Sequence, residues 1–267
     1  MSTALSTALR ADGRPLLVPY VTGGITADWT GFLRAYQEAG ADAIEVGLPF
    51  SDPMLDGPTI QEASDRALAR GATVESILAD IAATPLRVPV IVMTYANIVL
   101  RIGVPALAAA GVRGLIVPDL PLEESAGLEA AAAAAGVDLV LLAAPSTPDD
   151  RLREIGARSR GFVYAISVMG TTGERAALAG SAAVLAARVK RATDLPVLIG
   201  FGVSTPAQAA EAGRAGDGVV IASALMRRVL DGATAGALGA DVAALRTALD
   251  LGVSPGTPHA EVSGHRG

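Results

Sequence analysis

The sequence predicts a single (β/α)8 barrel, the TIM-barrel architecture. The chain has 267 residues, close to the ~250 residues that one such barrel typically takes. Eight short apolar runs rich in β-branched residues recur along it, and Ala-rich amphipathic stretches lie between them. Continuous apolar runs are typical of parallel strands buried on both faces, and parallel strands require helical crossovers.

The apolar runs give eight expected strands, which follow one another along most of the chain. They are Pro15–Thr22, Ala41–Leu48, Val88–Tyr95, Gly114–Asp119, Asp138–Ala144, Phe162–Ser167, Pro196–Val203 and Gly218–Ser223. The expected helices are Trp29–Ala39, Thr73–Ala83, Glu123–Ala135, Pro148–Ala157, Ala182–Ala192 and Pro206–Gly213. Thr147 and Thr205 each precede a proline, and a hydroxyl followed by proline suits a helix start.

A doubly wound open sheet has the same βα rhythm and is the alternative fold. Eight repeats, and the lack of a Gly-rich dinucleotide fingerprint after the first strand, favour the barrel. We expect residues 1–251 to form one barrel domain that includes a short N-terminal helix. Residues 252–267 lack periodicity and are expected to form a flexible tail.

The composition indicates a folded enzyme-like chain rather than a nucleic-acid-binding or disordered one. Hydrophobic residues make up 51% and charged residues 18%, and the net charge is -6. No apolar run reaches the roughly 18 residues of a membrane span, and the N-terminus lacks the pattern of a signal peptide. We therefore expect a cytoplasmic protein that binds neither membrane nor nucleic acid.

The scarce residue types limit the chemistry. The chain has no Cys, and its two His, His259 and His265, lie in the expected tail. The core therefore offers no metal site built from nitrogen and sulfur ligands. The only Lys, Lys190, precedes the seventh apolar run and is expected at the N-terminal end of the barrel, away from the catalytic face. Proton transfer then falls to carboxylates, Tyr, hydroxyls or water.

Glu45 is the first candidate for such a carboxylate. Alternation in the second strand puts Ala43, Glu45 and Gly47 on one face, and Ile44 and Val46 on the other. The branched residues suit the helix-facing side, so Glu45 is expected inside the barrel near the end where barrel enzymes act. A buried charge there must be paired or protonated. The alternative is an ion pair with an Arg, but the expected strands contain none.

A long loop follows this strand on the catalytic side and carries two more acids, Asp52 and Asp56. Asp-Pro and Asp-Gly are common turn formers, so either acid could be structural. Spacing alone leaves both roles open for each of them.

At this loop the chain resembles tryptophan synthase alpha chains. The resemblance rests on Ile44–Pro53 and Asp56–Gln61, and on similar segments over roughly residues 15–230. These are Asn97, Gly114–Pro121, Tyr164 with Ser167, Gly170–Gly173 and Ile199–Val203. The resemblance implies retro-aldol cleavage of indole-3-glycerol phosphate to indole and glyceraldehyde 3-phosphate. It implies Glu45 and Asp56 as the catalytic pair.

The implied roles agree with the chemistry. Glu45 would protonate indole C3 and then accept the proton of the 3′-hydroxyl, while Asp56 holds the indole N–H. Burial should raise the pKa of Glu45, and Asp56 should ionise more easily. The resemblance places Tyr164 at the site, although alone it would pass for a core aromatic. Asp119 is expected either to orient the Asp56 loop or to cap a turn.

The phosphate and indole ends follow from the resemblance and from the way barrels bind phosphate at the ends of their last strands. Phosphate is expected at Gly173, Gly202, Ala222 and Ser223. The family commonly has Gly at the position of Ala222, and Val168 stands where some members are basic. Tyr20, Ile60, Phe201 and either Leu115 or Ile116 are expected to line the indole pocket, unless they are ordinary core.

The resemblance also implies a partner, a pyridoxal-phosphate-dependent β chain in an α2β2 heterotetramer, with no cofactor in this chain. A freestanding lyase that releases indole, or a silent activator of a β chain, are the alternatives. A phosphosugar isomerase would be expected to place a His or Lys beside its carboxylate, and neither is expected in this core.

Overall fold

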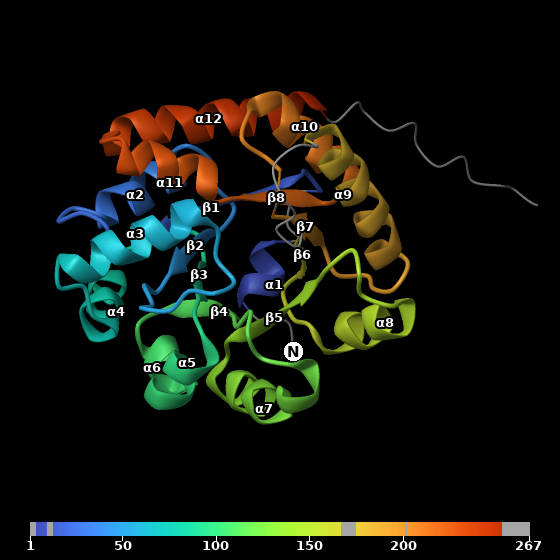
Figure 1. Ribbon diagram of the computed structural model, residues 1–267, viewed down its shortest axis with the longest axis horizontal. Coiled ribbons are helices and arrows are strands. Elements are labelled where there is room, and N and C mark those ends of the chain that lie inside the picture. The colour runs from blue at the N-terminus through green and yellow to red at the C-terminus, as the bar shows by residue number, and fades with distance from the viewer. Residues whose placement is uncertain (1–3, 10–12, 167–174, 201, 253–267) are drawn as a thin grey trace, which may run out of the picture.

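The computed structural model describes residues 4–9, 13–166, 175–200 and 202–252. Eight parallel strands form a closed barrel in chain order, and β8 pairs back onto β1. Figure 1 shows the strands at the centre of the molecule with the helices arranged around them. The (β/α)8 barrel is confirmed, and the doubly wound alternative is wrong.

All eight expected strands form, mostly over shorter spans than the apolar runs. They are β1 (Leu16–Thr22), β2 (Ile44–Gly47), β3 (Val90–Met93), β4 (Val112–Ile116), β5 (Asp138–Ala143), β6 (Val163–Ala165), β7 (Val197–Ile199) and β8 (Gly218–Ile221). One boundary changes a prediction, because β4 begins before Gly114 and contains Arg113. The expectation that no strand carries an Arg was therefore wrong.

The helices are α1 (Ala4–Ala8), α2 (Thr30–Glu38), α3 (Pro58–Ala69), α4 (Val74–Ala83), α5 (Ala96–Ile102), α6 (Val104–Ala109), α7 (Ala126–Ala135), α8 (Asp149–Arg158), α9 (Arg175–Lys190), α10 (Pro206–Ala215), α11 (Ser223–Leu230) and α12 (Ala235–Gly252), with a 3-10 turn at Leu122–Glu124. Thr205 caps α10 as expected, in a capping box with Gln208. Thr147 does not cap α8, because its hydroxyl instead accepts from the amide of Ala144 and closes the preceding turn.

The short N-terminal helix α1 forms and closes one end of the barrel. Figure 1 places it within the ring of strands. Leu5 is fully buried, and a Cβ on either Gly114 or Gly161 would lie 2.8 Å from its side chain. Those glycines let α1 approach, and the Ser6 hydroxyl donates to Asp138 at 3.0 Å. Barrel enzymes carry out their chemistry at the opposite end, where the strands terminate.

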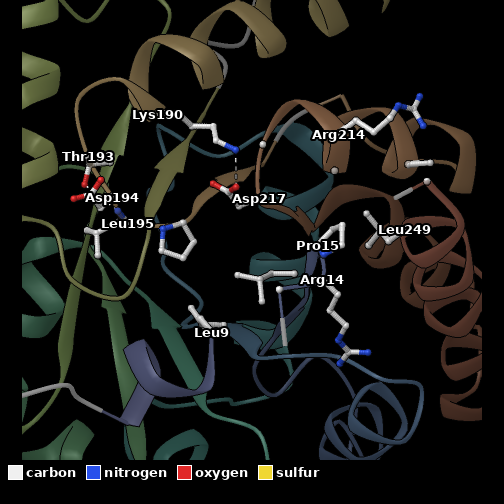
Figure 2. Close-up of a pocket in the computed structure, with 17 residues that line it drawn as sticks. Leu9, Arg14, Pro15, Lys190, Thr193, Asp194, Leu195, Arg214, Asp217 and Leu249 are labelled. Carbon is white, nitrogen blue, oxygen red and sulfur yellow. Dashed lines mark hydrogen bonds and ion pairs between the residues drawn. The ribbon is translucent and has the colours of Figure 1, made fainter. Parts of the chain in front are cut away.

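Lys190 lies at the same end as α1, as predicted. It lines a cavity of about 890 Å³ beside the N-terminal ends of β1 and β8. Figure 2 shows its ammonium group directed at Asp217, at 2.6 Å. Lys190 therefore forms a structural ion pair with Asp217.

The described part of the chain ends with α12, which includes Gly252, the first residue of the expected tail 252–267; residues 253–267 lie outside the described residues. No helix in the described segments is long and apolar enough to cross a membrane.

Candidate active site

Glu45 lies inside the barrel, as the alternation in β2 predicts. It pairs in register with Tyr20 on β1 and Ile91 on β3, and Ile91 belongs to the interior cluster of apolar side chains. Ile44 and Val46 instead pack in the larger cluster that includes the helices. Glu45 is 1% exposed, so its carboxyl is withdrawn from bulk water.

Burial raises the pKa of Glu45 to about 8, and the nearby charge of Asp56 adds to the effect. No described residue donates or accepts a hydrogen bond at its Oε2. Arg113 offers no ion pair, since it lies on the opposite side of β4 from Gly114, whose Cα faces interior Leu5 and Ile91. A carboxyl in this setting holds its proton at neutral pH and has one oxygen free for a substrate.

Asp56 lies in the loop between β2 and α3 and is half-buried. Its Oδ2 accepts a hydrogen bond from the Tyr95 hydroxyl at 2.8 Å. Burial raises the pKa of Asp56, and the Tyr95 hydrogen bond opposes that rise by favouring the ionised form. Asp52, by contrast, is exposed, and its carbonyl closes a local turn with the amide of Met54. Of the two loop acids, Asp56 is the one whose charge acts on Glu45.

Tyr95 is the functional residue that the sequence analysis missed. It precedes α5, beyond the end of β3, and its ring centroid lies 4.8 Å from that of Phe50. Its place at the end of the third expected strand, on the same side as Glu45, was the available signal. Nothing local in the sequence indicated that it would contact Asp56.

Asp119 acts one step further away. Its Oδ1 accepts from the amide of Ala96 at 2.8 Å, at the first residue of α5. It therefore holds the first amide of the helix that follows Tyr95, the residue that contacts Asp56. The two expected roles, orienting the Asp56 loop and capping a turn, stay predictions.

Two buried tyrosines, Tyr20 and Tyr164, complete the inner surface. Tyr20 exchanges a hydrogen bond with Thr22 at 3.2 Å. Burial raises the pKa of both tyrosines, and the charges of Glu45 and Asp56 add to it. The four side chains therefore lie within electrostatic reach of one another.

Two glycines make room for these rings. A Cβ on Gly47 would lie 1.9 Å from the Tyr20 hydroxyl, and one on Gly200 would lie 2.0 Å from Cε2 of Tyr164. Neither distance is compatible with a side chain unless the ring moves. The glycines at the ends of β2 and β7 thus set where the two tyrosines lie.

The indole-pocket candidates are only partly placed. Ile60 is buried at the start of α3, four residues after Asp56. Ile116 belongs to the interior cluster, whereas Leu115 packs in the cluster that includes the helices. Ile116 is therefore the one of these two that faces the barrel interior. Phe201 lies outside the described residues.

The expected phosphate residues gather after β7 and β8, which are neighbouring strands. Gly202 has φ of +70°, which favours glycine, and Ala222 directly precedes α11. The φ of Ala222 is -110°, so alanine is accommodated there without strain. Ser223 is the first residue of α11, whose N-terminal amides lack helical partners. Gly173 and Val168 lie outside the described residues.

Metal ligands are not grouped in this part of the molecule. Among the residues described, no three His, Cys, Asp or Glu side chains come together in a way that could hold an ion. The arrangement is thus a buried carboxyl with a raised pKa near a second carboxyl, and a helix start just after β8. Carboxyls in such a pair can transfer protons, and a helix start can bind an anion.

Comparison with known proteins identifies the family. A sequence profile described as tryptophan synthase alpha chain matches residues 6–247. This chain belongs to the tryptophan synthase alpha chain family. A member from Picosynechococcus sp. is 43% identical over 242 residues, covering 87% of this chain and 92% of the relative. A member from Methanosarcina acetivorans is 45% identical over 223 residues, covering 81% of each.

Solved structures of the family have the same fold. A structure of Mycobacterium tuberculosis tryptophan synthase superposes with a TM-score of 0.85 at 39% identity, covering 94% of this chain and 99% of the other. The tryptophan synthase alpha subunit of Legionella pneumophila also gives 0.85, at 29% identity, with 94% and 100% covered. The resemblance stated from the motifs is thereby confirmed, along with membership of a family that serves tryptophan biosynthesis.

Proposed function

We propose that this chain cleaves indole-3-glycerol phosphate to indole and glyceraldehyde 3-phosphate as the α subunit of tryptophan synthase. The observation that carries the proposal is the carboxylate pair. Glu45 is buried with no hydrogen-bond partner for its Oε2 among the described residues, and Asp56 is held near it by Tyr95. Two acids in unlike surroundings can divide acid and base roles at one pH.

The proton transfers balance without a cofactor in this chain. Protonated Glu45 delivers its proton to indole C3, and ionised Asp56 stabilises the positive charge that develops at the indole N–H. The bond between C3 and the glycerol chain then breaks, and its electron pair returns to the ring. The Glu45 carboxylate accepts the proton of the 3′-hydroxyl as the aldehyde forms, which restores the starting enzyme.

The rest of the site would bind and orient the substrate. Amides at the start of α11, with Ala222 and Gly202 beside them, suit the phosphate because an anion is stabilised at a helix N-terminus. Tyr20, Ile60 and Ile116 offer apolar surface to the indole. Tyr164, on the interior side of β6, would position the glycerol chain between them.

A β chain is the proposed partner, and pyridoxal phosphate would belong to it. Few large hydrophobic side chains of the described residues are exposed, and three of them lie on the Asp56 loop and on α5, the elements that follow β2 and β3. Met54 and Leu55 are 78% and 53% exposed on the Asp56 loop, and Leu100 is 69% exposed on α5. Exposed apolar patches mark interaction surfaces. A partner docked there in an α2β2 assembly would bear directly on Asp56 and would receive indole as it forms.

Steady-state cleavage of indole-3-glycerol phosphate by the purified chain, with and without excess tryptophan synthase β chain, tests the proposal. Slow cleavage that the β chain accelerates strongly is the expected result. Fast cleavage without the β chain would instead identify a freestanding lyase. No cleavage under either condition, with activation of the β chain's own reaction, would identify a silent activator and overturn the proposed catalysis.

A further inference from the structure

Two side chains with no part in the proposed proton transfers hold the loop that carries Asp56. The Tyr95 hydroxyl contacts the Asp56 carboxylate and the amide of Leu55, at 2.8 and 3.2 Å. The Gln61 side-chain amide donates to the carbonyl of Asp56 at 2.9 Å and to that of Pro53 at 3.3 Å. The loop is therefore fixed from two sides, by contacts of different chemical kinds.

The Tyr95 hydrogen bond is made to the charged group of Asp56. A phenol has one hydrogen, and the Leu55 amide can only donate, so the hydroxyl accepts from Leu55 and gives its hydrogen to Asp56. An ionised carboxylate is the stronger acceptor for that hydrogen. Burial and the Asp56 charge raise the pKa of Tyr95, so the phenol keeps its hydrogen over the working pH range.

Among the described residues, none donates a hydrogen bond to Oε2 of Glu45. Two nearby carboxyls in a buried site share a proton, and the negative charge settles on the better-solvated one. Glu45 is almost fully buried with its Oε2 unpartnered, while Asp56 is half-buried and accepts from a phenol. The Tyr95 hydroxyl is thus the described donor that distinguishes the two acids.

The Tyr95 side chain is itself fixed in place. It precedes α5, whose first amide, on Ala96, is held by Asp119. Its ring packs against Phe50, which follows β2. Phe50 belongs to the same β2–α3 loop as Asp56, so the hydroxyl is aimed at Asp56 by one contact from outside the loop, at the start of α5, and one from within it.

Gln61 differs because it touches only backbone. It lies in the first turn of α3, and both of its acceptors are carbonyl oxygens of the loop. Its loss would loosen the path of the loop and leave the Asp56 carboxylate with its phenol donor. The two residues therefore offer a way to separate an effect on charge from an effect on position.

We propose that Tyr95 and Gln61 are positioning residues for Asp56 with separate tasks. Tyr95 favours the ionised form of Asp56 and so keeps it charged to lower pH, beside a Glu45 that burial keeps protonated, and Gln61 only fixes the loop. The inference rests on the proposed function for its catalytic meaning. The effect of Tyr95 on the ionisation of Asp56 is a property of the carboxyl pair, and it is expected whether or not the chain cleaves the substrate.

The other titratable groups that face this pair are few among the described residues. They are Tyr20 on β1 and Tyr164 on β6, while Asp119 after β4 interacts with Tyr95. Both tyrosines have a raised pKa and stay neutral below pH 9. Between pH 4 and 9, the experiment below therefore follows the titration of the Glu45 and Asp56 carboxyls.

The test compares Tyr95→Phe, which keeps the ring against Phe50, with Gln61→Met, which keeps the side-chain length without a donor. Tyr36→Phe is the matched control. It removes another buried tyrosine hydroxyl, one that donates to the carbonyl of Tyr20 and not to a carboxylate. Carboxyl ¹³C resonances of Asp56 and Glu45, assigned with Asp56→Asn and Glu45→Gln, are titrated by NMR.

In Tyr95→Phe the titration of Asp56 should move up on the order of one pH unit, since a charged hydrogen bond is lost and water replaces part of it. Gln61→Met and Tyr36→Phe should leave it within a few tenths of a unit. An unmoved Asp56 titration in Tyr95→Phe, or an equal movement in Gln61→Met, would overturn the proposal. These NMR titrations can be measured even if the protein does not cleave the substrate.

Activity adds a second readout. In Tyr95→Phe the acidic limb of the kcat/KM profile should shift to higher pH together with the pKa of Asp56, and the basic limb should hardly move. The maximum should fall because less of the enzyme has Asp56 ionised and Glu45 protonated at the same time. Gln61→Met should lower kcat with both limbs in place. Glycerol 3-phosphate should bind all three variants within about threefold of wild type. An unmoved acidic limb in Tyr95→Phe contradicts the assigned task, whereas inactive wild type contradicts the proposed function instead.

Discussion

Replacing Glu45 by Gln should change the pH dependence of stability in a direction the structure specifies. The pKa of Glu45 rises from 4.5 to about 8 on folding because the carboxyl is buried. Between those values the folded state binds a proton that the unfolded state has released, so the free energy of unfolding falls as pH rises. The Glu45 contribution is fully present below pH 4.5 and is lost by the time pH passes 8.

At about 1.4 kcal/mol per pH unit, that interval corresponds to roughly 5 kcal/mol. Glutamine is neutral at every pH and has nearly the shape of a protonated glutamate. Glu45→Gln should therefore match wild type near pH 5 and exceed its free energy of unfolding by several kcal/mol at pH 8. The comparison isolates this carboxyl, because most other groups titrate alike in both proteins.

Urea unfolding from pH 5 to 8 measures the difference, followed by fluorescence and circular dichroism. Trp29, the only tryptophan, is 2% exposed and donates to Asp80, so it reports loss of the α2–α4 contact. Glu38→Gln is the matched control, because Glu38 is exposed on α2 and water already solvates its carboxyl. Stability curves of wild type and Glu45→Gln that run parallel over this range would refute the buried, protonated carboxyl.

Three further outcomes are expected. Gly200→Ala should displace the Tyr164 ring, lower activity and reduce the free energy of unfolding by about 1–3 kcal/mol in urea melts. Gly127→Ala is the control, because a Cβ there meets open space, and it should change neither activity nor stability. Equal effects of the two substitutions would contradict the packing argument. Leu100→Glu should leave the chain's own cleavage rate near wild type while weakening activation by a β chain at least tenfold in titrations; undiminished activation would place the docking surface elsewhere. Chelators should leave cleavage by this chain unchanged, and inhibition that a divalent metal reverses would overturn the carboxylate mechanism.

The sequence was sufficient for the barrel, because eight continuous apolar runs alternate with helical stretches, and for the direction of Glu45, because side chains alternate between the two faces of β2. Ile44 and Val46 mark the helix side of β2, and the side of Glu45 follows from them. The same reasoning could not find the contact between Tyr95 and Asp56. These residues are 39 positions apart, and their meeting depends on the register of β2 with β3 and on the path of a loop.

The last helix was also missed, for a related reason. Gly236 and Gly239 near the start of α12 weaken its local helical signal. Tertiary contacts hold it in place, with Gly239 against Ala35 of α2 and Arg246 paired with Asp42 at 3.1 Å. Tertiary packing rather than local helix propensity determines this helix, so the sequence alone could not show that it continues to Gly252 before any tail begins.

The central claim, that Glu45 is the acid and base of the cleavage, is tested most directly by the activity of Glu45→Gln. Single-turnover cleavage of indole-3-glycerol phosphate, with β chain present, is compared among wild type, Glu45→Gln and Asp56→Asn, and glycerol 3-phosphate affinity is measured on each. The account predicts no detectable cleavage in Glu45→Gln, a smaller loss in Asp56→Asn, and affinities within a few-fold of wild type. Normal turnover by Glu45→Gln would contradict the account.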